Sequence, residues 1–314
     1  MFEPVKDQVF VEDGCSYLSE GEMQAFSEMV TPSQFDPSAI KHSTVNVQYG
    51  TLPEQLLDIY KPDAGEGPFP VVFYVHGGGW VEGSKTLAPL QGIIGLIDHG
   101  YVVISVDYRL APATKFPEFL FDIKTAVRWA RAHAGAYGFD PKRFGMIGDS
   151  AGGHLTLMMG FTAGHPEYAG EAYGWAGESD ELQAICDMYG LSTLVDPMTP
   201  FYLESGVPRA MRDIQGEPTL FDRAFGTDNA DLLKLISPLS YIHRNVPPVL
   251  ILHGKKDGIV PYQHSTILKQ KIDKICGEGR AELILYDDRN HADYDFNKVG
   301  NSDTAAKFFD RYLK

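Results

Sequence analysis

A short glycine-rich stretch contains the residue best suited to nucleophilic chemistry. Ser150 lies between Gly148 and Gly152 at the G-x-S-x-G spacing. An apolar run at 144–147 precedes it and a helix-compatible segment at 154–159 follows, so the local pattern is strand, tight turn, helix. A nucleophile elbow needs both glycines, because side chains there would collide with neighbouring backbone in so sharp a turn. The stretch therefore predicts that Ser150 is an exposed nucleophile at the start of a helix.

A serine hydroxyl needs a general base, and the base needs an acid to orient it. His291 follows the last predicted strand and precedes the last predicted helix, and Asp257 follows the preceding strand in the same way. The chain order Ser150, Asp257, His291 is the one that this topology produces. Asp287 and Asp288 are rival acids because they are nearer His291, but they fall inside or at the tip of their own strand. We therefore predict Ser150, Asp257 and His291 as the catalytic residues.

Three consecutive glycines follow another apolar strand, in the run His76–Trp80. Such a run lets successive N–H groups point at one spot, which makes a nest for an anion. A flexible surface loop is the alternative interpretation. The position directly after a buried strand and upstream of the serine favours the nest, so we predict that the amides of Gly77, Gly78 and Ala151 form an oxyanion hole.

Short continuous apolar runs alternate with helical patterns from residue 70 onward, as expected of strands that helices cover on both faces. The predicted strands are Val71–Val75, Val102–Val106, Phe144–Ile147, Ala184–Met188, Val249–Leu252 and Leu283–Tyr286. The predicted helices are Leu87–His99, Glu118–His133, His154–Ala163, Gln263–Cys276 and Thr304–Leu313. This alternation predicts an α/β fold with a doubly wound, mostly parallel sheet, whose ligands bind at the carboxyl ends of the strands.

Three other segments complete the predicted organisation. Residues 44–49 and 56–60 flank a turn and predict an antiparallel pair at the sheet edge. Residues 1–43 carry apolar side chains at helical spacing and predict an N-terminal helical arm, which either packs on the body or forms part of a lid. The connection between the strands ending at 188 and beginning at 249 is too long for a simple loop, so we predict a small cap around 191–240 within a catalytic domain spanning 44–314.

Composition limits the partners that the protein could bind. The 314 residues carry a formal net charge of −15, which argues against nucleic acid and anionic membrane surfaces. Three widely separated cysteines and the lack of His, Asp or Glu pairs at ligand spacing predict no disulfide framework and no metal. We expect no cofactor, because no dinucleotide or phosphate-binding fingerprint occurs. The absence of a signal-like or membrane-spanning run predicts a cytoplasmic protein, and homo-oligomer formation stays open.

Five motifs together resemble a known family. They are HGGGW, VDYRLAP, GDSAGGH, HGKKDGIVP and NHAD, in this order along the chain. They are similar to the hormone-sensitive-lipase-like and related acetyl-xylan or feruloyl esterase branches of the α/β-hydrolase fold, from Val45 to the C-terminus. The resemblance implies hydrolysis of carboxylic esters without a cofactor. It also implies that Asp107 and Arg109 brace the loops under the site, and we expect Asp149 to accept a hydrogen bond near the elbow.

The sequence therefore predicts a serine carboxylesterase that hydrolyses short-chain acyl or aryl esters through an acyl-enzyme. Aromatic side chains near the active edge or in the cap are expected to bind the substrate: Trp80, Tyr108, Tyr189, Phe201 and Tyr202. Four other histidines are expected to be structural: His76, His154, His253 and His264. An aryl-formamidase-like amide hydrolase is an alternative, because its oxyanion loop is also similar to His76–Trp80. A non-catalytic small-molecule receptor on the same fold is a second alternative, which the presence of His291 disfavours.

Overall fold

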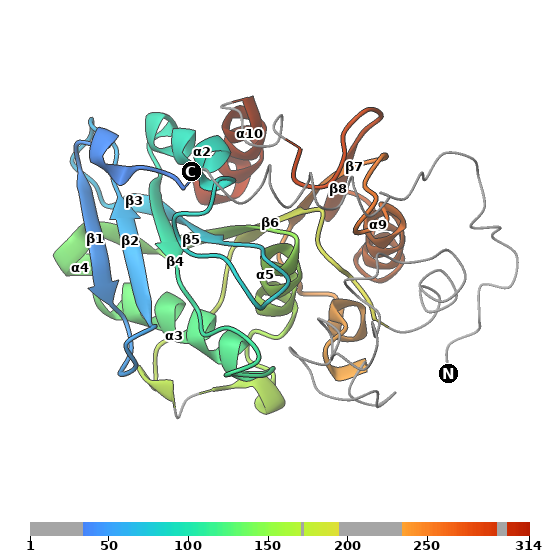
Figure 1. Ribbon diagram of the computed structural model, residues 1–314, viewed down its shortest axis with the longest axis horizontal. Helices are drawn as coiled ribbons and strands as arrows, with labels where there is room; N and C mark the ends of the chain where they lie inside the picture. The colour runs from blue at the N-terminus through green and yellow to red at the C-terminus, as the bar shows by residue number, and fades with distance from the viewer. Residues whose placement is uncertain (1–33, 171–172, 195–233, 294–299) are drawn as a thin grey trace, which may run out of the picture.

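The computed structural model describes residues 34–170, 173–194, 234–293 and 300–314. An eight-stranded sheet runs through this part of the chain in the order β1-β2-β4-β3-β5-β6-β7-β8 (Figure 1). The strands are β1 (Ser43–Gln48), β2 (Leu56–Tyr60), β3 (Phe69–Val75), β4 (Val102–Val106), β5 (Phe139–Asp149), β6 (Ala184–Met188), β7 (Val249–Gly254) and β8 (Ala281–Tyr286). Strands β3 to β8 are parallel, whereas β2 pairs antiparallel with both β1 and β4. The predicted sheet, including its antiparallel edge, is confirmed.

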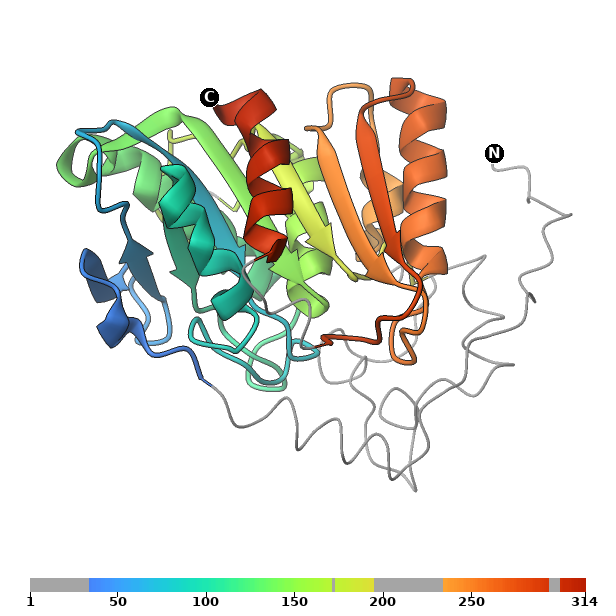
Figure 2. The same ribbon diagram turned by 90° about the horizontal axis from the view of Figure 1, so that it is seen from above.

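Helices cover both faces of the sheet. The α-helices are α2 (Leu90–Ile93), α3 (Glu118–Ala132), α4 (Ala134–Tyr137), α5 (Ala151–Phe161), α9 (Gln263–Cys276) and α10 (Gly300–Leu313). The 3₁₀ helices are η1 (Pro37–Ala39), η2 (Ile94–His99), η3 (Pro166–Tyr168) and η6 (Pro238–Tyr241). Helices α3, α5 and α9 pack on one apolar core, and α2, η2 and α10 pack on another. Figure 2 shows α2 and α10 side by side on the near face of the sheet.

The two cores explain why the strands read as continuous apolar runs. Along β3, Val71, Phe73 and Val75 belong to one core, while Val72 and Tyr74 belong to the other. Successive side chains of a strand point to opposite faces, so a sheet covered on both sides needs apolar residues at every position. All five side chains are fully buried.

Several helices differ from their predicted bounds. Helix α10 begins at Gly300, before the predicted start at Thr304, and α3 ends at Ala132, one residue before the predicted end. The segment predicted as one helix over 87–99 forms a short α2 that continues as the 3₁₀ helix η2. Gly92 and Gly95 lie in this segment and weaken its helical preference. Helix α5 begins at Ala151, before the predicted start at His154, because Gly152 is helical rather than part of the turn.

The described ends of the predicted arm and cap both contact the body. Phe35, near the end of the arm, packs edge-on against Tyr60 with ring centroids 5.6 Å apart. At the base of the cap, the Leu194 N–H donates to Ser237 Oγ at 2.8 Å. Leu194 and Ser237, which lie on either side of residues 195–233, are thus neighbours in the structure. Most of the predicted arm and cap lies outside the described residues, so both remain predictions.

Candidate active site

Ser150 occupies a sharp turn between β5 and α5. Its backbone has φ 53° and ψ −118°, a conformation that is strained for an L-residue and is expected at a nucleophile elbow. The flanking glycines leave no room for side chains. A Cβ at Gly148 would lie 2.3 Å from the Gly152 carbonyl oxygen, and one at Gly152 would lie 2.1 Å from that of Val75. The turn therefore requires both glycines, and it presents Ser150 at the carboxyl edge of the sheet.

Ser150, His291 and Asp257 lie within hydrogen-bonding distance in series. Ser150 Oγ is 2.9 Å from His291 Nε2, and His291 Nδ1 is 2.7 Å from Asp257 Oδ2. Because an ionised carboxylate can only accept, Nδ1 carries the ring proton and Nε2 offers its lone pair to the serine hydroxyl. The three residues follow β5, β8 and β7, whose ends meet at one edge of the sheet (Figure 2). Such a series can remove the proton from the serine.

The Asp257 carboxylate is buried and accepts four hydrogen bonds. Its Oδ1 accepts from the N–H groups of Ile259 at 2.9 Å and Val260 at 2.8 Å. Its Oδ2 accepts from His291 and, at 3.1 Å, from His253 Nε2. Burial by itself raises the pKa of Asp257, but electrostatic attraction by the two imidazole rings and the hydrogen bonds that they donate outweigh it and hold the pKa well below its usual value. Asp257 therefore stays ionised and can orient the imidazole.

The two rival acids lie at the surface. The Asp287 side chain is 84% exposed and pairs with Lys255 Nζ at 2.7 Å. Asp288 is also exposed. The structure thus places Asp257, and neither rival, against the His291 ring.

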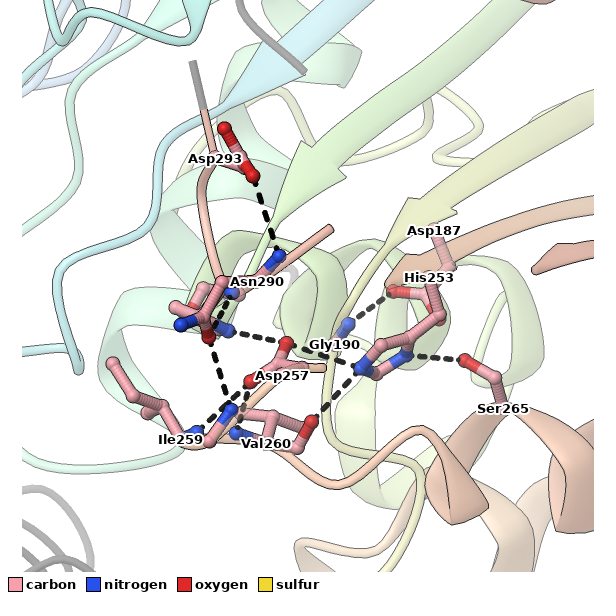
Figure 3. A network of polar contacts seen from close by, with 12 residues as sticks. Asp187, Gly190, His253, Asp257, Ile259, Val260, Ser265, Asn290 and Asp293 are labelled. Carbon is pink, nitrogen blue, oxygen red and sulfur yellow. Dashed lines mark hydrogen bonds and ion pairs between the residues drawn. The ribbon is translucent and has the colours of Figure 1, made fainter. Parts of the chain in front are cut away.

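Asn290 links the acid loop to the histidine loop, a contact that the sequence did not predict. Its Oδ1 accepts from the N–H groups of Gly258 at 3.1 Å and His291 at 2.7 Å. Figure 3 shows Asn290 lying beside the Asp257 loop, with Asp293 on its other side. In the sequence, the only indication of this role was that Asn290 directly precedes the predicted base, His291. Its second partner, Gly258, belongs to a loop that is distant in the sequence. Asn290 fixes the distance between the two loops.

The glycine loop after β3 offers N–H groups to the site, but not the pair that the sequence predicted. The Gly77 N–H already donates to Asp149 Oδ1 at 3.0 Å, so it is not available to an oxyanion. Gly78 and Gly79 have φ of 107° and 58°, which turn the loop back on itself. In the part of the chain that the structure describes, no acceptor bonds to the N–H groups of Gly78, Gly79 or Ala151. These three amides, rather than that of Gly77, are available to a ligand.

Asp149 ties the glycine loop to the elbow. Besides the Gly77 N–H, its Oδ1 accepts from the Tyr74 hydroxyl at 2.8 Å. The predicted role of Asp149 as a local acceptor is therefore confirmed. Burial raises the pKa of Asp149 to about 6, although both hydrogen bonds favour the ionised form.

Side chains beneath the glycine loop hold it in place. The buried His76 donates from Nδ1 to the Gly77 carbonyl at 2.7 Å, and its ring stacks on Tyr108 with centroids 4.3 Å apart. The Tyr108 hydroxyl donates to the His76 carbonyl at 2.9 Å. Tyr108 was predicted to bind substrate, but it is only 3% exposed and lies under the loop. Its geometry is that of a support, because both its ring and its hydroxyl contact His76.

Asp107 and Arg109 brace the same region, as the resemblance implied. Asp107 Oδ1 accepts from the Lys85 N–H at 2.6 Å, and its Oδ2 lies 3.1 Å from Lys85 Nζ. Arg109 donates twice to the buried Asp122, both times at 2.8 Å, and reaches Glu118 at 3.1 Å. Both residues are thus engaged in structural ion pairs.

Of the other four residues predicted to line the substrate pocket, the structure describes two, and both are buried. Tyr189 is fully buried, and its ring meets the His291 ring edge-on with centroids 4.9 Å apart. Trp80 is 1% exposed and meets His154 edge-on at 5.3 Å. Phe201 and Tyr202 lie outside the described residues.

His154 and His264 are buried and structural, as predicted. His154 Nε2 donates to the Ile236 carbonyl at 2.7 Å, and His264 Nδ1 accepts from the Ser192 N–H at 3.2 Å. Burial lowers the pKa of His154 to about 4 and that of His264 to about 3, so both rings are neutral at pH 7. Both contacts join the base of the predicted cap to α5 and α9.

The described residues show neither a metal cluster nor a membrane-spanning helix. They contain no group of three or more His, Cys, Asp or Glu side chains placed to hold a metal ion. None of their helices has the length and apolar character needed to cross a bilayer.

Sequence comparison identifies the family. The model of the BD-FAE family matches residues 57–272, which is more than half of the chain. The chain belongs to the BD-FAE family. The matched range starts in β2, includes the glycine loop, Ser150 and Asp257, and ends within α9.

Curated relatives of this BD-FAE member include two esterases of Mycobacterium tuberculosis. Esterase LipC is 34% identical over 233 residues, which cover 72% of this chain and 54% of LipC. Esterase LipQ is 31% identical over 220 residues, which cover 68% of this chain and 48% of LipQ. The chain thus spans about half the length of the curated relatives it matches.

Solved structures confirm the predicted α/β-hydrolase fold. A truncated carbohydrate esterase from gut microbiota has a TM-score of 0.73 at 24% identity, covering 89% of this chain and 99% of that one. A propionate-bound esterase of Thermogutta terrifontis has a TM-score of 0.66 at 24% identity, covering 88% and 96%. At these identities the likeness concerns the fold, which this BD-FAE member shares with structures of esterases.

Proposed function

We propose that this BD-FAE member is a serine carboxylesterase that hydrolyses small esters of short acyl chains through an acyl-enzyme. The observation that carries the proposal is the hydrogen-bonded series from Ser150 through His291 to Asp257. The esterases LipC and LipQ among its relatives support the same reaction class. A receptor would have no need of a buried, ionised acid behind a histidine whose second nitrogen faces a strained serine.

Acylation begins with attack of Ser150 Oγ on the ester carbonyl carbon. As the new C–O bond forms, the hydroxyl proton moves to His291 Nε2 across the present 2.9 Å contact. The ring is then an imidazolium, and the carboxylate of Asp257, 2.7 Å from Nδ1, stabilises its charge. Because Asp257 is already oriented by its other donors, this stabilisation requires no rearrangement.

The carbonyl oxygen becomes an oxyanion that accepts hydrogen bonds from the amides of Gly78, Gly79 and Ala151. Ala151 is the first residue of α5, so the positive end of the helix dipole adds to its N–H. One such donor is typically worth about 10²- to 10³-fold in kcat. The imidazolium then gives its proton to the alcohol oxygen, which leaves. Water hydrolyses the acyl-enzyme by the same sequence of proton transfers.

The acyl group is proposed to be short, from acetyl to about hexanoyl, since each buried methylene adds about 0.8 kcal/mol only until the chain meets the pocket wall. Propionate and butyrate are bound in structures of the Thermogutta terrifontis esterase, which has the same fold. The alcohol part is proposed to be a small soluble molecule, so that acetylated sugars are among the candidate substrates, in keeping with the carbohydrate esterase among the similar structures. Membranes and nucleic acids are not proposed as partners, given the net charge of −15.

Covalent labelling and one substitution test this proposal. A fluorophosphonate should phosphonylate Ser150, and peptide mass spectrometry locates the adduct. The Ser150→Ala protein should remain folded by circular dichroism, take up no label, and lose about 10⁴- to 10⁶-fold in kcat on p-nitrophenyl acetate. An adduct on another serine, or undiminished turnover by Ser150→Ala, would show that Ser150 is not the nucleophile.

A further inference from the structure

His253 is a second histidine in direct contact with the catalytic acid. It lies near the end of β7, is completely buried, and uses both ring nitrogens. Nε2 is 3.1 Å from Asp257 Oδ2 and 2.8 Å from the Val260 carbonyl oxygen, while Nδ1 is 2.7 Å from Ser265 Oγ. Figure 3 shows the ring held between the acid loop on one side and Ser265 of α9 on the other.

The partners determine where the ring proton lies. A backbone carbonyl oxygen can only accept, and so can an ionised carboxylate. Nε2 of His253 therefore carries hydrogen, which it shares between Val260 and Asp257. In the neutral ring, Nδ1 then accepts from the Ser265 hydroxyl. His253 is thus a fixed hydrogen-bond donor to the acid rather than an incidental neighbour.

The donated hydrogen bond falls on the oxygen that also serves His291. Asp257 Oδ2 accepts from both histidines, whereas Oδ1 is held by two backbone amides. Hydrogen bonds on both oxygens restrain rotation of the carboxylate plane. Without His253, Oδ2 would keep only the hydrogen bond to His291. The free-energy cost of burying the ionised carboxylate would then be offset less completely. The plane of the carboxylate, and with it the tilt of the imidazole, would then be less well defined.

We propose that His253 is a positioning residue, which holds the Asp257 carboxylate in the orientation that aligns His291 with Ser150. This inference rests on the proposed function, because it requires Asp257 to be the orienting acid. The buried His264, by contrast, accepts a hydrogen bond from the Ser192 N–H. In the sequence analysis, His253 was placed among the structural histidines. Residue type and spacing did not indicate its contact with Asp257.

Two substitutions of nearly equal size separate the donor from the bulk of the ring. In His253→Gln, the side-chain amide reaches the former position of Nε2 and can still donate to Asp257. In His253→Asn, the shorter amide ends near the former position of Nδ1, beside Ser265, and cannot reach the acid. Misplacement of a catalytic group by ~1 Å can cost about 100-fold, so we expect His253→Asn to lose about 10- to 100-fold in kcat with KM nearly unchanged. His253→Gln should recover most of the loss.

Rates are compared per active site, counted by fluorophosphonate labelling, so that unfolded protein does not count as inactive enzyme. The matched control is His264→Asn, which removes an equally buried ring from the neighbouring helix α9. It should lower the melting temperature but leave kcat per labelled site unchanged. If His253→Asn does not fold, Ser265→Ala releases Nδ1 and should give a smaller, severalfold loss of kcat. Unchanged kcat in whichever variant folds would overturn the inference.

A double-mutant cycle decides whether His253 acts through Asp257. If it does, the His253→Asn/Asp257→Asn protein should be no slower than Asp257→Asn alone. Losses that multiply would mean that His253 acts by another route and would overturn the inference. Undiminished kcat in Asp257→Asn would instead overturn the catalytic assignment itself. A large loss in Asp257→Asn together with none in His253→Asn would leave that assignment intact and reject only the positioning role.

Discussion

The Gly77 N–H donates to Asp149 Oδ1 across 3.0 Å, which joins the glycine loop to the residue immediately before the nucleophile. The same oxygen accepts from Tyr74 at the end of β3. Gly77 precedes the two glycines whose amides are proposed as oxyanion donors, so this contact constrains where those amides lie relative to Ser150. The distance between Ser150 and the proposed oxyanion hole therefore depends on one buried carboxylate.

Asp149→Ala should lower kcat because both hydrogen bonds to the glycine loop and β3 are lost. Leaving buried donors unpaired costs about 1–3 kcal/mol each, so the unfolding free energy should fall as well. Asp149→Asn should do less damage, since its amide oxygen can still accept from Gly77. Tyr74→Phe removes one bond and spares the one to the loop, so its kcat should stay near that of the wild type. Steady-state kinetics with urea unfolding measure both effects, and equal kcat for Asp149→Ala and Tyr74→Phe would contradict this account.

Asp257→Asn should reduce kcat by several orders of magnitude, because an amide can donate to His291 and favour the tautomer in which Nε2 is no longer a base. The wild-type acid remains ionised throughout the usual assay range, since its pKa is held well below the ordinary value by the two histidines despite its burial. Asp287→Asn and Asp288→Asn are the matched controls and should each have little effect, given their exposure. A greater loss of kcat in Asp288→Asn than in Asp257→Asn would show that Asp257 is not the orienting acid.

The elements and the hydrogen-bonded series of Ser150, His291 and Asp257 could be predicted because each follows from local pattern and chain order. Strands such as β3 are continuous apolar runs, and Ser150, Asp257 and His291 each follow a strand at the same edge. Which glycine faces the site could not be predicted in this way. It depends on the positive φ of Gly78 and Gly79 and on the bond that engages Gly77, and these are properties of the folded loop.

Contacts between loops were the other part that the sequence could not supply. Asn290 joins its own loop to Gly258, and His253 joins β7 to α9 through Ser265. Each of these residues has an ordinary structural interpretation when its sequence neighbours alone are considered. Tyr108 was assigned to the substrate pocket because it follows a strand, but its side chain turns under the glycine loop. The direction of a side chain after a strand depends on packing, which residue order does not reveal.

The buried Asp187 should make the protein less stable as the pH rises from acidic to neutral. Its Oδ1 accepts from the Gly190 N–H at 3.1 Å, while Oδ2 is buried with no hydrogen-bond partner among the described residues. Burial raises the pKa of Asp187 from 3.8 to about 7, with His253 and the Gly190 N–H opposing the rise. The folded state thus binds this proton more tightly than the unfolded state does. Its contribution to stability is complete below pH 3.8 and is lost as the pH rises through about 7.

The corresponding experiment compares the wild type with Asp187→Asn by urea unfolding at pH 5 and pH 8.5. The cost of ionising Asp187 is on the order of 4 kcal/mol at most, at about 1.4 kcal/mol per pKa unit. The wild type should therefore lose more unfolding free energy between the two pH values than Asp187→Asn, which has no charge to acquire. Asp149 ionises in both proteins and so cancels in the comparison. The same pH dependence in both proteins would show that Asp187 does not carry a raised pKa.

The acyl chain-length profile tests the proposed substrate class. Tyr189, whose ring lies edge-on against that of His291 beside Ser150, is fully buried. We expect kcat/KM for p-nitrophenyl esters to peak between acetate and hexanoate and to fall steeply for decanoate and palmitate, because overpacking costs about 1–3 kcal/mol once the chain meets the wall. The same assay with N-formylkynurenine tests the alternative amide hydrolase, and Ser150→Ala supplies the background rate. A palmitate optimum would exclude a short acyl pocket. Dominant turnover of N-formylkynurenine would assign the site to formamide hydrolysis, with the same serine, histidine and aspartate.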